Sequence, residues 1–214
     1  MIKKILLAIA LFLILSVAYY QVWFLRQPER NIPNNESVFV SPANGKVVAV
    51  THWEKEKLVW NKDAGAVQVL TKDIGDSGWL IAIEMDITNV HFQRAPVSSQ
   101  LIGEEYTPGQ FNNALIQKNP YGFRVENERN TLFFKTPEGL KYKVVQIAGL
   151  LARRIEDYVE PTQEVKQGEV IGLIKLGSQV ALILPEGIQP MVKADDRVVD
   201  GETILATIKA PMNN

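Results

Sequence analysis

The chain has 214 residues, with 23 lysines and arginines against 24 aspartates and glutamates, so its formal net charge is −1. This balance argues against a nucleic-acid-binding protein, because such proteins usually carry a basic excess or patch. The chain contains no cysteine and two histidines, His52 and His91, which excludes disulfides and thiolate sites and leaves little for a multi-histidine metal centre. We therefore expect no metal and no nucleic-acid partner, and a chemistry based on hydroxyls, carboxylates, amines or a group made from the chain itself.

Residues 5–25 form an apolar run that follows Lys3 and Lys4 and contains two polar residues. As a helix this run would extend about 31 Å, close to the ~30 Å core of a bilayer. A cleavable signal peptide is the alternative, but no small-x-small cleavage site follows. The run ends with aromatic residues that suit a membrane interface, namely Tyr19, Tyr20, Trp23 and Phe24. We predict a retained membrane anchor at residues 1–25 and a separate domain at residues 26–214.

After residue 30 the pattern becomes that of β-strands, with short runs rich in valine, isoleucine and aromatic residues between glycine, proline or asparagine. This pattern predicts a mainly β fold, an antiparallel barrel or sandwich, with one or two short helices. A helix is expected at 148–157, and residues 108–119 form either a helix or an irregular loop. The expected strands are 37–40, 46–53, 57–61, 66–71, 79–88, 122–126, 131–136 and 141–147.

The C-terminal third contains an internal repeat. Residues 165–171 (VKQGEVI) match residues 198–204 (VVDGETI), and residues 44–48 (NGKVV) form a looser third copy. A turn glycine followed by a charge and β-branched residues suits a tight turn that leads into a strand. The repeat favours a compact β-sandwich with lipoyl-like hybrid-motif features, although valine-rich strands could begin this way without any such relation. No lysine lies at a hairpin tip as in a true lipoyl domain, so a carrier function is not expected.

The usual catalytic signatures are missing: the chain has no phosphate-binding glycine loop, no zinc-protease motif and no nucleophile elbow. What remains is the segment 176–179 (LGSQ) between the apolar runs 173–175 and 180–184. By itself this segment would be an ordinary Gly-Ser turn.

The segment gains significance from its neighbours. Residues 26–214 resemble phosphatidylserine decarboxylases of the short, archaeal-type branch. The resemblance is carried, in family order, by RQPER (26–30), SPANGKVV (41–48), MDITNVHFQRAPVS (85–98), ENERN (126–130), VVQIAGLLARRI (144–155), VKQGEVIGLIKLGS (165–178) and LPEG (184–187).

In this family the Gly-Ser bond of the last long motif breaks itself, and the serine becomes an N-terminal pyruvoyl group. The resemblance therefore implies cleavage between Gly177 and Ser178, which gives a β chain of residues 1–177 and an α chain of residues 178–214. The pyruvoyl group would replace an external cofactor, because decarboxylation of an α-amino acid needs an electron sink conjugated to the amine. Ser178 Oγ would attack the Gly177 carbonyl, and a hydroxyl is a weak nucleophile that needs a neighbouring base.

His91 is the expected base, because a near-neutral pKa suits both the cleavage and the later proton transfer. His52 lies outside every shared motif and is expected to be a surface residue. The family pattern S-P-A-D-G has an aspartate where this chain has Asn44. The resemblance gives that position the role of orienting the histidine, and an amide supplies an oxygen acceptor without a charge. Asn44 is therefore expected to be a weaker catalytic partner of His91.

The implied substrate is phosphatidylserine in the membrane, whose head group carries a carboxylate and a phosphate. Arginines in the shared motifs are therefore candidates for substrate binding, although each could be a structural ion-pair partner; they are Arg94, Arg129 and Arg153. We expect a cell-membrane protein with its catalytic domain on the cytoplasmic face, although basic residues on both sides of the anchor leave its orientation open. The β chain is expected to stay with the α chain, and a homo-oligomer is left open.

Two alternatives come from other classes of protein. The first is an uncleaved, non-catalytic membrane-tethered β-domain that binds lipid or protein, and Asn44 is the residue that favours it. The second is a membrane-fusion-type adaptor with a lipoyl-like domain, which is disfavoured because the sequence contains no long helical hairpin.

Overall fold

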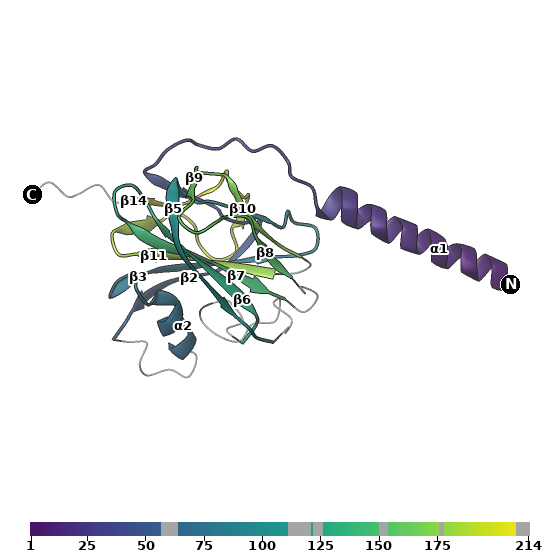
Figure 1. Ribbon diagram of the computed structural model, residues 1–214, viewed down its shortest axis with the longest axis horizontal. Helices are drawn as coiled ribbons and strands as arrows, with labels where there is room; N and C mark the ends of the chain where they lie inside the picture. The colour runs from purple at the N-terminus through teal and green to yellow at the C-terminus, as the bar shows by residue number, and fades with distance from the viewer. Residues whose placement is uncertain (57–63, 111–120, 122–125, 150–153, 176–177, 209–214) are drawn as a thin grey trace, which may run out of the picture.

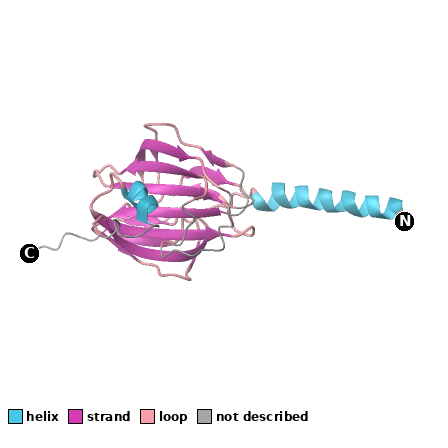
Figure 2. Ribbon diagram, turned by 90° about the horizontal axis from the view of Figure 1, so that it is seen from below, coloured by secondary structure: helices cyan, strands magenta, loops and turns pink. Residues whose placement is uncertain are grey.

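The computed structural model describes residues 1–56, 64–110, 121, 126–149, 154–175 and 178–208. Helix α1 (Ile2–Ala18) continues directly into the π-helical segment η1 (Tyr19–Phe24). Together they project from the β-domain (Figures 1 and 2). None of the residues of α1 is buried, and the helix Ile2–Phe24 is long and apolar enough to cross a membrane.

The rest of the chain is a curled set of antiparallel strands, as the sequence predicts. The largest sheet has eight strands in the order β13-β2-β3-β11-β7-β6-β5-β9, and two three-stranded sheets have the orders β1-β14-β12 and β4-β10-β8. The strands are β1 (Val38–Val40), β2 (Gly45–Glu54), β3 (Ser77–Met85), β4 (Phe92–Arg94), β5 (Ser99–Thr107), β6 (Arg129–Lys135), β7 (Lys141–Ala148), β8 (Ile155–Asp157), β9 (Glu164–Val165), β10 (Val170–Ile174), β11 (Ser178–Pro185), β12 (Ile188–Pro190), β13 (Arg197–Val198) and β14 (Ile204–Ile208).

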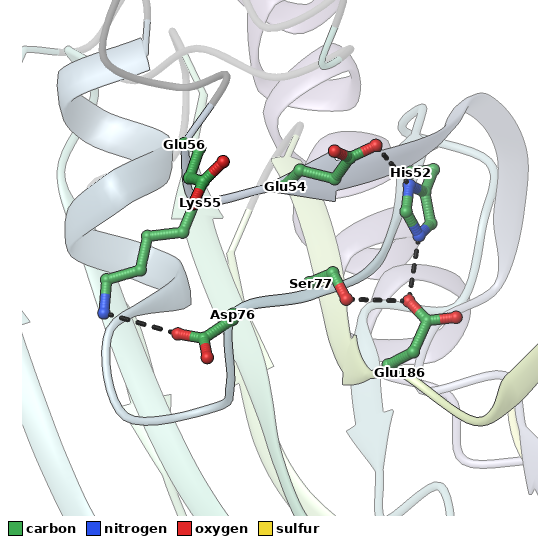
Figure 3. A pocket seen from close by; sticks show the side chains of 7 residues that line it. All are labelled: His52, Glu54, Lys55, Glu56, Asp76, Ser77 and Glu186. Atoms are coloured by element: carbon green, nitrogen blue, oxygen red, sulfur yellow. Dashed lines mark hydrogen bonds and ion pairs between the residues drawn. The ribbon is translucent and has the colours of Figure 1, made fainter.

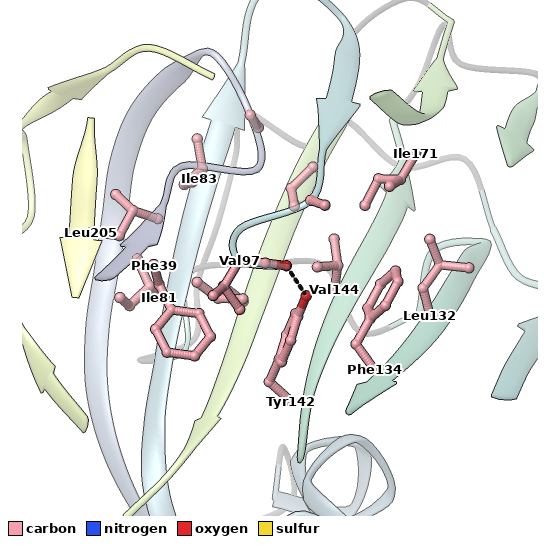
Figure 4. Packing of buried hydrophobic residues seen from close by; sticks show 14 of the residues in the cluster. Phe39, Ile81, Ile83, Val97, Leu132, Phe134, Tyr142, Val144, Ile171 and Leu205 are labelled. Atoms are coloured by element: carbon pink, nitrogen blue, oxygen red, sulfur yellow. Dashed lines mark hydrogen bonds between the residues drawn. The ribbon is translucent and has the colours of Figure 1, made fainter. Parts of the chain in front are cut away.

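The main core lies on one face of the large sheet and is centred on aromatic residues (Figure 4). The Tyr142 ring is stacked on Phe134 at 5.3 Å and meets Phe39 edge-on at 5.4 Å between centroids. Its hydroxyl lies 2.7 Å from Ser99 Oγ and donates to the Val97 carbonyl at 3.3 Å. These bonds satisfy a polar group that burial would otherwise penalise. Burial also raises the pKa of Tyr142.

The other face of the sheet is covered by the short helix α2 (Ala64–Thr71), as Figure 2 shows. The expected strand at 66–71 is therefore wrong. Val67 and Leu70 are three residues apart and both pack into the second hydrophobic cluster, with Leu80 and Ile183 of the sheet. A short apolar run fits a buried helix as well as a strand, so its periodicity does not decide between them.

Several other expectations need comment. The expected helix at 148–157 is wrong at both ends, because Ala148 ends β7 and Ile155–Asp157 form β8. Its centre, most of 108–119, the whole of 57–61 and most of 122–126 lie outside the described residues. The predicted strand 79–88 stops at Met85, because Asp86 begins a turn in which its carboxylate accepts from the Thr88 N–H at 2.8 Å.

Two of the three repeat copies contain the turn that the sequence predicts. Gly168 and Gly201 have φ angles of 80° and 75°, a region that favours glycine. Gly45 differs: a Cβ there would lie 2.2 Å from the Glu84 carbonyl oxygen, so this glycine permits close strand contact instead. The segment between η1 and β1, residues 25–37, is the linker between the anchor and the domain. Its residue Ile32 packs against both turn glycines, which attaches the linker to the domain.

Candidate active site

Ser178 is the first residue of β11, the fourth of the eight strands in the large sheet. Its Cα pairs with Met85 at the end of β3 and with Ala148 at the end of β7. The side chain is fully buried, and its Oγ has no hydrogen-bond partner among the described residues. An unsatisfied buried hydroxyl costs about 1–3 kcal/mol. Gly177, the other residue of the predicted cleavage bond, lies outside the described residues.

His91 is also fully buried, just before β4. Its Nδ1 lies 3.0 Å from the Asn89 carbonyl oxygen, which accepts hydrogen bonds only, so Nδ1 carries the proton in this geometry. The other nitrogen, Nε2, is buried without a partner in the described part of the chain. Burial lowers the pKa of His91 to about 4, with the nearby Arg26 acting in the same direction and the Asn89 hydrogen bond and Asp86 opposing it. The ring is therefore neutral at pH 7, with a free lone pair on Nε2 that can accept a proton.

The fold brings Ser178 and His91 to the same end of the large sheet. The loop that leaves Met85, the strand partner of Ser178, reaches His91 six residues later. The His91 carbonyl accepts from the Ile174 N–H at 3.2 Å, and Ile174 is four residues before Ser178. The connection through β3 and the hydrogen bond to β10 therefore place the predicted nucleophile and the predicted base at the same end of the large sheet.

Asn44 lies beside the same loop but is not bonded to the His91 ring. Its Oδ1 accepts from Asn89 Nδ2 at 2.9 Å and from the Val90 N–H at 3.4 Å. The expected direct hydrogen bond from His91 to Asn44 therefore needs correction, because Asn89 occupies Nδ1. Asn44 thus acts on His91 indirectly, because it accepts a hydrogen bond from Asn89, whose carbonyl is bonded to the His91 ring. The carboxylate that acts electrostatically on His91 is Asp86.

The end of the N-terminal helix completes the site. Phe24 is fully buried, and its ring centroid lies 4.2 Å from that of His91, with the two planes inclined by 33°. Tyr19 Oη donates to the Ile87 carbonyl at 2.7 Å, and Arg26 Nη2 donates to the Thr88 carbonyl at 2.7 Å. The sequence predicts an anchor here, but none of its features indicates that the anchor reaches the histidine loop.

A second feature that sequence reasoning missed is a buried chain of polar side chains behind the histidine. Gln93 Nε2 donates to the His91 carbonyl at 2.6 Å, Gln146 Nε2 donates to Gln93 Oε1 at 2.9 Å, and Asn130 Nδ2 lies 3.4 Å from Gln146 Oε1. The available signal was limited to Gln146, a glutamine inside the otherwise apolar run 144–148. The chain is not fully bonded, because Asn130 Oδ1 has no partner among the described residues, but the bond between Gln93 and Gln146 links β4 to β7 behind the histidine.

The three arginines expected to bind substrate differ in their surroundings. Arg94 donates to Asp200 at 2.8 Å, to the Gly168 carbonyl at 2.9 Å and to the Pro28 carbonyl at 3.3 Å. Asp200 also accepts from Arg30. Arg94 is thus part of a structural ion-pair cluster that fastens the linker, which corrects its assignment. Arg129 is half-buried at the start of β6, which lowers its pKa while Glu105 opposes the shift, and its role stays a prediction. Arg153 lies outside the described residues.

His52 lines an open polar pocket of about 570 Å³ at the other end of the sheet (Figure 3). Its Nε2 lies 2.9 Å from a Glu186 carboxylate oxygen, which also accepts from Ser77 Oγ at 3.0 Å. His52 pairs with Trp79 in register, whereas Ser178 pairs with Met85. Six residues of strand correspond to about 20 Å, so this pocket is remote from Ser178.

Comparison with known proteins agrees with this arrangement. The family model described as phosphatidylserine decarboxylase matches residues 18–206. A phosphatidylserine decarboxylase proenzyme of Ruegeria pomeroyi is 37% identical over 212 residues, which covers 95% of this chain and 89% of the relative. One of Erythrobacter litoralis is 39% identical over 86% of this chain and 72% of the relative. A putative archaetidylserine decarboxylase proenzyme of Methanothermobacter thermautotrophicus is 35% identical, over 91% and 83% respectively.

Proposed function

Because the chain belongs to the phosphatidylserine decarboxylase family, we propose that it converts phosphatidylserine to phosphatidylethanolamine and CO₂ with a pyruvoyl group made from Ser178. The observation that carries this proposal is a pair of buried polar atoms without partners in the described structure, Ser178 Oγ and His91 Nε2. The two residues lie at the same end of the large sheet. Other buried atoms also lack a partner in the described structure, among them Trp53 Nε1 and Asn130 Oδ1. Ser178 Oγ and His91 Nε2 differ from these because one belongs to a potential nucleophile and the other to a potential base.

The residues around Ser178 fit the formation of that group. A serine at the start of a central strand has its backbone fixed by neighbours on both sides, Met85 and Ala148. Its hydroxyl makes no competing hydrogen bond in the described structure. A neutral histidine with an open Nε2 can take the hydroxyl proton.

The cleavage proceeds in balanced steps. Ser178 Oγ loses its proton to His91 Nε2 and attacks the Gly177 carbonyl carbon. The peptide C–N bond then breaks as His91 returns the proton to the Ser178 nitrogen, which leaves an ester and a free amine. Removal of the Ser178 α-proton then expels the carboxylate of residues 1–177 from the β-carbon. Water adds to the remaining dehydroalanine after tautomerisation, ammonia leaves, and a ketone remains at the start of residues 178–214.

The pyruvoyl group supplies an electron sink for the carboxylate's bonding pair during decarboxylation. The chain's own residues supply binding and proton control. His91, neutral because it is buried, can take or return a proton at Nε2. Arg129 is our candidate for the head group, because a guanidinium pairs with carboxylate or phosphate in a bidentate manner.

The N-terminal helix supports the membrane assignment. It places the His91 loop directly at the base of a helix that can span a bilayer, so the site would face lipid head groups. We propose a single-anchor cell-membrane protein with the domain on the cytoplasmic face. The two chains formed by cleavage would stay joined, because β11 of the α chain hydrogen-bonds to β3 and β7 of the β chain.

Reductive trapping tests the proposal. The full-length protein, purified in detergent with phosphatidylserine, is treated with cyanoborohydride, which fixes an amine on a ketone. We expect substrate mass on residues 178–214 alone, and none on a Ser178→Ala protein. A natural chain that stays whole and takes no label would favour the second candidate, a non-catalytic tethered β-domain, which Asn44 in place of an aspartate supports.

A further inference from the structure

The contacts between the helical segment and the domain are concentrated on one loop. Tyr19 and Arg26 donate to the carbonyls of Ile87 and Thr88. Leu25 packs against the small apolar cluster of Val90, Phe92 and Leu173. Of the domain residues in these contacts, four lie within four positions of His91, namely Ile87, Thr88, Val90 and Phe92. The segment 19–26 therefore contacts the histidine loop both before and after His91 in the chain.

Phe24 differs from the rest of the helix. Every residue of α1 is exposed to the surroundings of the helix, and Phe12, for example, is 68% exposed, whereas Phe24 is 0% exposed. Tyr20 stacks on Phe24 at 5.4 Å, and Phe24 in turn lies on the His91 ring at 4.2 Å. A membrane tether requires apolar residues facing lipid and does not require one that is buried against an imidazole.

We propose that Phe24 is a positioning residue for His91, so that the last turn of the anchor is part of the active site. This inference rests on the proposed function. Asn89 fixes His91 at Nδ1, and a hydrogen bond at one atom leaves the ring free to rotate about its axis. The rotation left free is a tilt of the imidazole plane about the Nδ1···O direction, because rotation about the Cβ–Cγ bond would break the Asn89 hydrogen bond. The Phe24 ring, 4.2 Å away between centroids, lies against the imidazole and opposes this tilt, which keeps Nε2 pointing in one direction.

The same contact keeps water from His91. The charged groups that act on the imidazole are Asp86 from its own loop and Arg26 from the segment after Phe24, and these oppose one another. Because burial is the largest influence on His91, removal of the ring that covers it would change the histidine's titration as well as its position. A purely structural contact would change stability alone.

The first experiment follows His91 directly in the full-length protein. Imidazole NMR signals are titrated in lipid nanodiscs, with His52→Gln in the background so that one histidine remains. We expect Phe24→Ala to raise the His91 midpoint by about one to two pH units, toward the ordinary value of 6.5, with Phe24→Leu in between. Phe12→Leu, the matched exposed position, should leave the midpoint unchanged. An identical midpoint in all four proteins would overturn the proposal.

The second experiment exchanges parts of the anchor. Replacement of residues 2–18 by an unrelated leucine-rich helix should retain cleavage at 177–178, because α1 buries nothing. Replacement of residues 19–25 at equal length and hydropathy should slow cleavage at least tenfold, although the protein still sediments with membranes. Equal cleavage by both chimaeras would refute a role for this turn. If the natural chain never cleaves, the proposed function fails, while the titration still decides whether Phe24 controls His91.

Discussion

The two histidines lie toward opposite ends of the large sheet, His52 within β2 and His91 in the loop between β3 and β4, and they have opposite surroundings. His52 is exposed and lies against the carboxylates of Glu186 and Glu54, at 2.9 and 3.8 Å. His91 is buried beneath Phe24, bonded at one nitrogen, with the other nitrogen left without a partner in the described structure. The first arrangement is stable at little cost. The second arrangement lowers the stability of the folded protein, because burial opposes protonation of the imidazole and leaves one of its nitrogens without a hydrogen bond.

The ion-pair cluster of Asp200, Arg30 and Arg94 shows how buried charges are paired away from the candidate site. Asp200 is fully buried and accepts from both Arg30 and Arg94, and Arg94 also bonds two backbone carbonyls. The side-chain groups of this ion-pair cluster are therefore paired with one another. At the Ser178 edge two polar atoms are not. Unpaired buried atoms occur elsewhere as well, for example Trp53 Nε1, so the assignment of the site depends on the chemistry of the serine and the histidine, which the following experiments test.

The largest effect is expected at Ser178. Ser178→Ala removes both the attacking oxygen and the source of the ketone, so we expect a folded, uncleaved chain with no decarboxylation. Mass spectrometry and CO₂ release from phosphatidylserine measure the two losses. Ser99→Ala is the matched control, a buried serine whose oxygen is bonded to Tyr142 and Val97; it should cost about 1 kcal/mol of stability and still cleave. Cleavage of the Ser178→Ala chain at 177 would disprove the pyruvoyl assignment.

The histidine pair comes next. His91→Ala should slow cleavage or decarboxylation by about 10²- to 10⁴-fold, the usual contribution of a positioned base. His52→Ala should leave both rates unchanged and cost at most about 1 kcal/mol, since its ion pairs are exposed. Rates and circular dichroism are measured on both variants. Equal losses of rate in two folded proteins would show that burial does not identify the working histidine.

Acid sensitivity follows from the lowered pKa of His91. The folded state resists protonation down to about pH 4, whereas the unfolded chain binds that proton near pH 6.5. Stability should therefore fall as the pH drops from about 6.5 to 4 and level off below, by up to about 3 kcal/mol. Urea unfolding of the natural protein and of His91→Gln measures the difference. Parallel pH profiles of the two proteins would mean that His91 is not buried in its neutral form.

The smallest expected effect concerns Asn44. Its Oδ1 accepts two hydrogen bonds from the histidine loop, and an aspartate could accept both more strongly while adding a charge that favours protonated His91. Asn44→Asp should therefore cleave faster, by about tenfold if the gain is near 1.4 kcal/mol, whereas Asn44→Ala should be slower because Asn89 loses its acceptor. Mass spectra taken over time distinguish the three proteins. Indistinguishable rates would remove position 44 from the account.

Much of the fold follows from the sequence, because alternating apolar strands and turn glycines are local signals. Gly168 and Gly201 occupy the left-handed turns that their repeats predict. The errors arise where a short apolar segment fits two structures. The short apolar run 66–71 fits either a strand buried on both faces or a helix. Val67 and Leu70 are three residues apart and share one face only in a helix, and both pack on the sheet in α2.

The sequence could predict which residues belong to the candidate site but not how they are placed relative to one another. The motif identifies Ser178 and His91, but their placement at one edge depends on strand register, which pairs Ser178 with Met85. Asn44 is near the histidine, but Asn89 takes the bond expected of it. Phe24 lies 67 positions from His91 in the chain, and an apolar anchor sequence contains no signal that one of its rings covers a catalytic group.

The central claim, that Ser178 becomes the start of a second chain, is tested most directly by the intact mass of the natural full-length protein. We predict two species, residues 1–177 and residues 178–214, with the smaller chain lacking a free N-terminal amine and having the mass of a ketone in place of serine. A single species at the full mass of the 214-residue chain, under conditions in which the fold is intact, would contradict it.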